Sequence, residues 1–70
     1  MTARLEYTPR IDVGHGFDAY VFRFAGLGGR EVRVYDAESN NLRRKFKSTG
    51  DRDVAIINAR ECARVLSEEL

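Results

Sequence analysis

Hydrophobic and polar residues alternate near the N-terminus with the two-residue period of a β-strand. Over residues 3–13 the apolar side chains stand at odd-numbered positions (Ala3, Leu5, Tyr7, Ile11 and Val13) and the polar side chains at even-numbered positions (Arg4, Glu6, Thr8, Arg10 and Asp12). A period of two predicts a strand that is buried on one face. Pro9 lacks an N–H group, so we expect this strand to lie at a sheet edge or to bend there.

Three more strands are predicted, each after a segment of turn-forming residues. The turns are expected at 14–16, 26–29 and 36–41, and the strands at 17–24, 30–35 and 42–47. From their alternation we expect the following side chains to face the core: Tyr20, Phe22, Phe24, Val32, Val34, Leu42 and Phe46. The opposite face is then expected to carry Ala19, Val21, Arg23, Glu31, Arg33, Tyr35, Arg43, Lys45 and Lys47. Arg44 falls on the core side, where we expect it to lie at the sheet margin or to pair with an acid of the helix.

After Ser48 the hydrophobic period lengthens to that of an α-helix. Apolar residues recur at helical spacing: Val54, Ala55, Ala59, Cys62, Ala63, Leu66 and Leu70, widened by Ile56 and Val65. Ser48, Thr49 and Asp51 are candidate N-caps. The pattern predicts a helix from about Asp51 to near the chain end. Because the connections are short, we expect an antiparallel meander of three to four strands with this helix packed on one face. The predicted fold is α+β, a single ββββα domain over residues 1–70.

Composition narrows the classes of protein that this chain can be. Its 70 residues are 43% hydrophobic and 33% charged, which is typical of a globular domain. No uncharged stretch exceeds six residues, whereas a membrane-spanning helix needs about 20 apolar residues. No charged start leads into an apolar run after Met1, so we expect no secretory signal and no membrane partner. Cys62 is the only cysteine; we expect it in the core, and we expect a cytoplasmic location in a bacterium or its host.

The sequence offers no convergent set of catalytic residues, so we expect a protein that is not an enzyme and needs no cofactor. His15 is the only histidine and lies between two glycines, as a solvated turn residue does. Asp12, His15 and Asp18 bracket one turn, but their spacing matches no zinc motif, and no metal site is predicted. The glycines of 26–29 lack the Lys-Ser/Thr of a phosphate loop and are interpreted as a hairpin turn.

A cluster of cations is the strongest functional feature. The predicted open face carries six cations and one aromatic ring: Arg10, Arg23, Arg33, Arg43, Lys45, Lys47 and Tyr35. Such a surface can neutralise phosphates, and guanidinium groups can reach guanine edges in a major groove. We therefore favour nucleic-acid binding, with DNA as the candidate. A solvated or protein-contacting face is the alternative, because Glu6, Asp12 and Glu31 dilute the charge and the net charge of the chain is only +1.

The end of the last strand and the start of the helix resemble a known family. Phe46 ends a strand, Gly50-Asp51-Arg52 lead into the helix, and Val54-Ala55-Ile56 with Ala59 begin its buried side. Over residues 30–66 this layout is similar to the arm-type DNA-binding domains of phage tyrosine recombinases and to the related plant AP2 domain. The resemblance implies a sheet laid into the major groove, with Arg33, Arg43, Lys45 and Lys47 as contacts. The strand predicted at 3–13 has no counterpart in that pattern.

A protein partner is the competing hypothesis. The chain runs from an initiator Met to a helix ending near Leu70, so we expect a complete small gene product. In size and layout it is similar to phage-encoded inhibitors or adaptors that act on host protein complexes, anti-CRISPR proteins included. An exposed edge strand, 3–13 or the opposite edge, could add to a partner sheet or form a homodimer. The partner is therefore predicted to be DNA or a nucleic-acid-handling protein complex.

Overall fold

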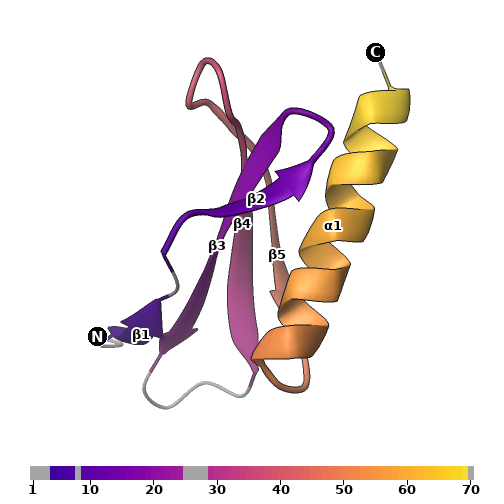
Figure 1. The fold of residues 1–70 in the computed structure, drawn as a ribbon. Helices are drawn as coiled ribbons and strands as arrows, with labels where there is room; N and C mark the ends of the chain where they lie inside the picture. Colours follow the sequence, from indigo (N-terminus) through magenta and orange to yellow (C-terminus); the bar gives the residue numbers. More distant parts are fainter. Residues whose placement is uncertain (1–3, 8, 25–28, 70) are drawn as a thin grey trace.

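Among the residues that the structure describes, five strands and one helix form the fold (Figure 1). A computed structural model describes residues 4–7, 9–24 and 29–69, and for residues 4–7 and 24 it describes the backbone only. The elements are β1 (Arg4–Tyr7), β2 (Ile11–Gly14), β3 (Phe17–Phe24), β4 (Arg30–Asp36), β5 (Leu42–Ser48) and α1 (Arg52–Glu68). The predictions for the side chains of residues 3–8, Phe24 and Leu70, and for the turn at 26–28, lie outside the described residues.

The sheet is an antiparallel meander, as the short connections predicted. β3 pairs with β4 and β4 with β5, while β1 and β2 both pair with β3 along its other edge. The predicted first strand is therefore divided in two, and Pro9 lies between the parts, where the missing N–H led us to expect a bend. The helix packs on one face of the sheet, which makes the fold α+β, as predicted (Figure 1).

The helix begins directly after its N-cap residue, Asp51. Asp51 has an extended backbone, and its Oδ1 accepts a hydrogen bond from the Val54 N–H at 3.0 Å, satisfying one of the amides that a helix start leaves without a partner. At the other end the Glu69 N–H donates to the Leu66 carbonyl. Within the described part of the chain, no helix is long and apolar enough to cross a membrane.

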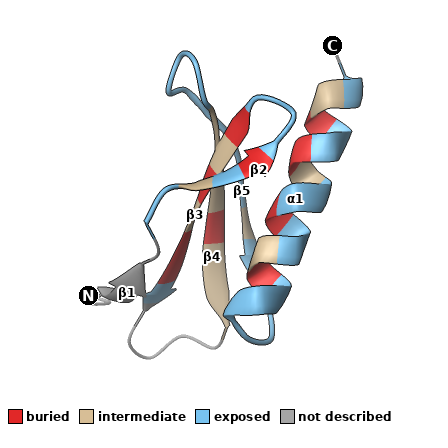
Figure 2. Ribbon diagram, viewed as in Figure 1, coloured by how far each residue is buried: buried red, intermediate tan, exposed pale blue. Residues whose placement is uncertain are grey.

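The core lies between α1 and the sheet, where the red segments of both elements face each other in Figure 2. Its buried members are Val13, Phe17, Ala19, Val21, Val32, Val34, Ala55, Ala59, Ala63 and Leu66. Three alanines spaced four residues apart form the centre of the helical stripe, and each is fully buried. Because alanine is small, this stripe lets the helix backbone approach the sheet closely. The predicted stripe is confirmed there, whereas Val54 and Val65 lie at its margin and are partly exposed.

The orientation predicted for β3 is wrong. Ala19 and Val21 face the helix, opposite Val34 and Val32 of β4. Tyr20 therefore lies on the other side of the sheet. The physical reason is packing: the alanines of α1 share one core with Ala19, Val21 and the Phe17 ring, whereas Tyr20 contacts Phe22 and Tyr35 on the other face. Apolar side chains stand at both odd and even positions of this strand, so alternation alone could not show which set faces the helix.

The predicted sides of Phe22 and Arg23 are wrong for the same reason. Phe22 is buried, at 7% exposure, but on the sheet side away from the helix, opposite Glu31. Arg23 follows Val21 in the alternation and so belongs to the helix side, where it is exposed. It does not join the cations of the opposite face.

Because of a β-bulge in β5, the predicted sides of Leu42 and Arg43 are also wrong. Val34 pairs with Arg44, but the next residue, Tyr35, pairs with Leu42, so Arg43 is an extra residue in the strand. A bulge reverses the side-chain alternation beyond it. Leu42 is consequently 50% exposed and opposite Tyr35 rather than in the core. The predicted sides of Val32, Val34, Arg44 and Phe46 are correct.

Candidate binding surfaces

The sheet face that the helix does not cover is defined by the pairing of its strands. We call it the open face; its described side chains are Arg10, Asp12, Asp18, Tyr20, Phe22, Glu31, Arg33, Tyr35, Leu42, Lys45 and Lys47. Directly paired residues of neighbouring strands project to the same side. Tyr20, Arg33 and Lys45 therefore form one row across the face. Phe22, Glu31 and Lys47 form the next row.

Three aromatic rings pack together on the open face. The Tyr20 and Tyr35 ring centroids are 5.7 Å apart at 86°, an edge-to-face contact, and Tyr20 and Phe22 are 6.1 Å apart. The Arg33 guanidinium lies 4.7 Å from the centre of the Phe22 ring. This contact helps to explain why Phe22 is buried without a helix above it. The prediction from the sequence placed Tyr20 and Phe22 under the helix and so missed this aromatic cluster. Apolar side chains stand at both odd and even positions of β3, which was a signal that both faces of the strand carry apolar groups.

Two of the predicted cations are partnered within the open face. Arg33 Nε lies 2.7 Å from Glu31 Oε2, and hydrogen bonding to this carboxylate raises the pKa of Arg33. Arg10 Nε lies 2.6 Å from Asp18 Oδ2. These pairs fix the side chains on the sheet, but each also places a negative charge next to a positive one, which lowers the local potential.

Lys45 and Lys47 are the cations of the open face that remain available. Both are exposed, opposite Arg33 and Glu31 respectively, and neither forms an ion pair with another described residue. The described face carries four basic and three acidic side chains. The lysines lie on the edge strand β5, whereas two of the acids, Asp12 and Asp18, lie on β2 and β3. The positive charge is therefore concentrated along β5.

Arg43 does not belong to the open face. Because of the bulge, its guanidinium reaches Asp36 at 3.6 Å and lies 5.6 Å from the centre of the buried Phe17 ring. Of the seven residues predicted to bind, five come together on the open face: Arg10, Arg33, Tyr35, Lys45 and Lys47. Arg23 and Arg43 do not.

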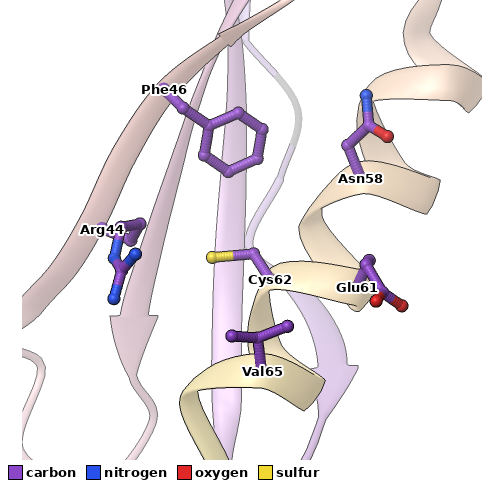
Figure 3. A pocket seen from close by; sticks show the side chains of 6 residues that line it. All are labelled: Arg44, Phe46, Asn58, Glu61, Cys62 and Val65. Atoms are coloured by element: carbon purple, nitrogen blue, oxygen red, sulfur yellow. The ribbon is translucent and has the colours of Figure 1, made fainter.

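A second surface lies between the edge strand and the helix. We call it the β5–α1 groove; it is lined by Arg44, Phe46, Asn58, Glu61, Cys62 and Val65, and its volume is ≈ 360 Å³. In Figure 3 the Cys62 sulfur points from the helix toward β5, with the Phe46 ring on one side of it and Val65 on the other. Burial raises the pKa of the Cys62 thiol, which keeps it neutral. The groove was not predicted, because it depends on the helix lying beside β5.

Polar contacts hold the two walls of the β5–α1 groove together. Arg44 lies 3.3 Å from Glu69, so the expectation of a pair with an acid at the helix is confirmed. Asn58 donates a hydrogen bond of 2.8 Å to the buried Ser48 hydroxyl. One contact lies toward each end of β5, so the apolar residues between them form a supported slot.

The turn at 14–16 forms as predicted. All three of its residues have positive φ, and that of His15 is 58°. His15 Nδ1 lies 3.5 Å from the Ser67 hydroxyl, so the turn reaches the end of α1. Among the described residues, no three His, Cys, Asp or Glu side chains come close enough to hold a metal ion.

Known proteins provide no further guide to either surface. Comparison with protein-family models, with curated proteins and with solved structures found no match to this chain.

Proposed function

We propose that this protein is a non-catalytic binding protein that contacts nucleic acid, with DNA as the first candidate, through the open face of its sheet. The observation that carries the proposal is the position of Lys45 and Lys47. Both are exposed on this face, without an ion pair to another described residue, beside the aromatic cluster. Ammonium groups in such a position neutralise phosphates and release their counterions.

The arrangement of charge and rings favours a particular binding geometry. The lysines lie on β5, Tyr35 lies on β4, and Tyr20 lies on β3. A strand of nucleic acid that follows β5 would have its phosphates beside the lysines and its bases toward the two tyrosines. Both tyrosines are half-buried, and the accessible part of an aromatic ring can bind an unpaired base by stacking. We therefore expect single-stranded DNA to bind more tightly than the corresponding duplex.

Salt-dependent binding tests the proposal directly. Each phosphate contact on a single strand contributes about 0.7 to the slope of log affinity against log salt. The double variant Lys45→Ala/Lys47→Ala should therefore reduce that slope by about 1.4. The assay is fluorescence anisotropy with a labelled single-stranded oligonucleotide of mixed sequence, titrated at several salt concentrations.

A matched control removes the same charge from the other side of the molecule. Arg52 and Arg60 are exposed residues of α1, and Arg52→Ala/Arg60→Ala should leave the slope unchanged if binding is on the open face. Equal losses in the two double variants would mean that binding depends on net charge alone. The absence of any binding by the wild-type protein at low salt would end the nucleic-acid proposal.

A protein partner is the second candidate function. It is favoured by a separate observation, the β5–α1 groove beside an edge strand, and not by the open face. This surface would suit an inhibitor or adaptor that binds a segment of another protein.

A further inference from the structure

The outer edge of β5 is not paired with any of the described strands. β5 pairs with β4 alone among the described strands, so its other edge presents backbone N–H and C=O groups. The bulge at Arg43 interrupts the regular ladder, which leaves 44–48 as the regular part of that edge. This part also runs along the β5–α1 groove, since Arg44 and Phe46 line it.

The β5–α1 groove provides an apolar site next to that edge. Phe46, Cys62 and Val65 supply its apolar wall, and Val65 is 39% exposed although it is hydrophobic. A volume of ≈ 360 Å³ is at the lower end of the roughly 300–1,000 Å³ of ligand sites. A slot of this size beside a strand edge that no described strand occupies suits the side chains of an extended peptide.

The charge of β5 selects the chemistry of that peptide. β5 contains Arg43, Arg44, Lys45 and Lys47 and no acidic residue. The two arginines have acidic partners in Asp36 and Glu69, while the lysines project onto the open face. A second copy of β5 placed along this edge would oppose like charges, which is unfavourable. An added strand with acidic side chains on the open face would instead lie beside the lysines.

We propose that an extended segment of a partner protein, in which apolar residues alternate with Asp or Glu, binds along β5 as an additional strand. Successive side chains of a strand point to opposite faces. The apolar residues would therefore enter the β5–α1 groove, and the acidic residues would lie beside Lys45 and Lys47. This interaction goes beyond nucleic-acid binding, since the groove and the strand edge carry it and the aromatic cluster takes no part.

The test uses a capped, labelled peptide of alternating Val and Glu, and a second peptide in which Lys replaces Glu. Fluorescence anisotropy should show saturable binding of the Val/Glu peptide, at least tenfold tighter than that of the Val/Lys peptide. Amide chemical shifts of the full chain should change at 44–48 and at Cys62 and Val65. Binding of both peptides with equal affinity, or no saturable binding of the Val/Glu peptide, would overturn the proposal.

A pair of helix variants separates the groove from the rest of the surface. Val65→Gln should weaken binding of the Val/Glu peptide about tenfold, because it places an amide in the apolar wall. Ile57→Gln is the matched control, because Ile57 is 64% exposed on the same helix and does not line the β5–α1 groove. The affinity of this variant for the Val/Glu peptide should stay within about twofold of wild type. Equal affinities of the two variants would refute the groove as the site. Neither substitution lies on the open face, so DNA binding measured alongside should remain unchanged in both, whichever way the peptide result falls.

Discussion

Replacing Gly29 with alanine tests how closely β4 and β5 must approach at the end of the sheet. A Cβ at this position would lie 2.6 Å from the backbone oxygen of Ser48, closer than such atoms are found in proteins. The residue also has φ of 73°, a conformation that costs an alanine roughly 1–2 kcal/mol. The oxygen belongs to the backbone of β5, so the clash cannot be relieved by turning a side chain.

Gly16 is the control that separates the two costs. It has φ of 83°, but a Cβ there would meet nothing within 4 Å. Gly16→Ala should therefore show the conformational cost alone, roughly 1–2 kcal/mol. Gly29→Ala should show the same cost plus that of displacing packed backbone, a further 1–3 kcal/mol or so. A chain of this length has only about 4–10 kcal/mol of stability in total, so we expect Gly29→Ala to remove roughly half of it.

Urea denaturation followed by far-UV circular dichroism measures both variants, since linear extrapolation gives the free energy of unfolding of each. In thermal melts, each 1 kcal/mol should lower the midpoint by roughly 4–8 °C for a domain of this size. The reasoning fails if the two variants lose stability equally within about 0.5 kcal/mol, because the clash with Ser48 would then have no energetic consequence.

Three further predictions concern the helix cap, the core and a surface carboxylate. Asp51→Ala should lower the free energy of unfolding by about 0.5–2 kcal/mol in urea denaturation, because the Val54 N–H loses its acceptor, and an unchanged value would contradict the role of the cap. Val34→Ala should cost about 2–3 kcal/mol in the same assay because Val34 is fully buried, whereas Leu42→Ala should cost under about 1 kcal/mol; the reverse order would place Leu42 in the core and exclude the bulge. Hydrogen bonds from the backbone N–H groups of Ser39 and Glu38 lower the pKa of Asp36 below its usual value of 3.8. Above pH 3.8 the charged carboxylate therefore stabilises the folded protein, and this contribution is lost as the pH falls through the lowered pKa of the folded state. Asp36→Asn should therefore have a lower urea midpoint than wild type well above pH 3.8 and an equal one well below it, and a difference that persists in acid would exclude this cause.

The candidate site could be predicted only in part. Alternation correctly placed Lys45, Lys47, Arg33 and Tyr35 on one face, because β4 is regular up to Tyr35 and β5 is regular after its bulge. It misplaced Arg43, since a bulge adds one residue and no feature of the sequence marks its position. The β5–α1 groove could not be found at all, because its walls come from two elements whose distance apart is set by packing.

The order and type of the elements follow from local properties of the chain. Hydrophobic period, turn-forming residues and the cap at Asp51 each act within a few residues, so the sequence alone was sufficient to predict an antiparallel sheet with a C-terminal helix. The choice of buried face in β3 is different in kind, because both Ala19/Val21 and Tyr20/Phe22 are apolar. That choice depends on what lies opposite: Ala19 and Val21 pack with the alanines of α1 in a core that also holds the Phe17 ring, while Tyr20 contacts Phe22 and Tyr35 on the other face. Packing at a distance in sequence therefore decided where the aromatic cluster lies, and with it the surface that is open to a partner.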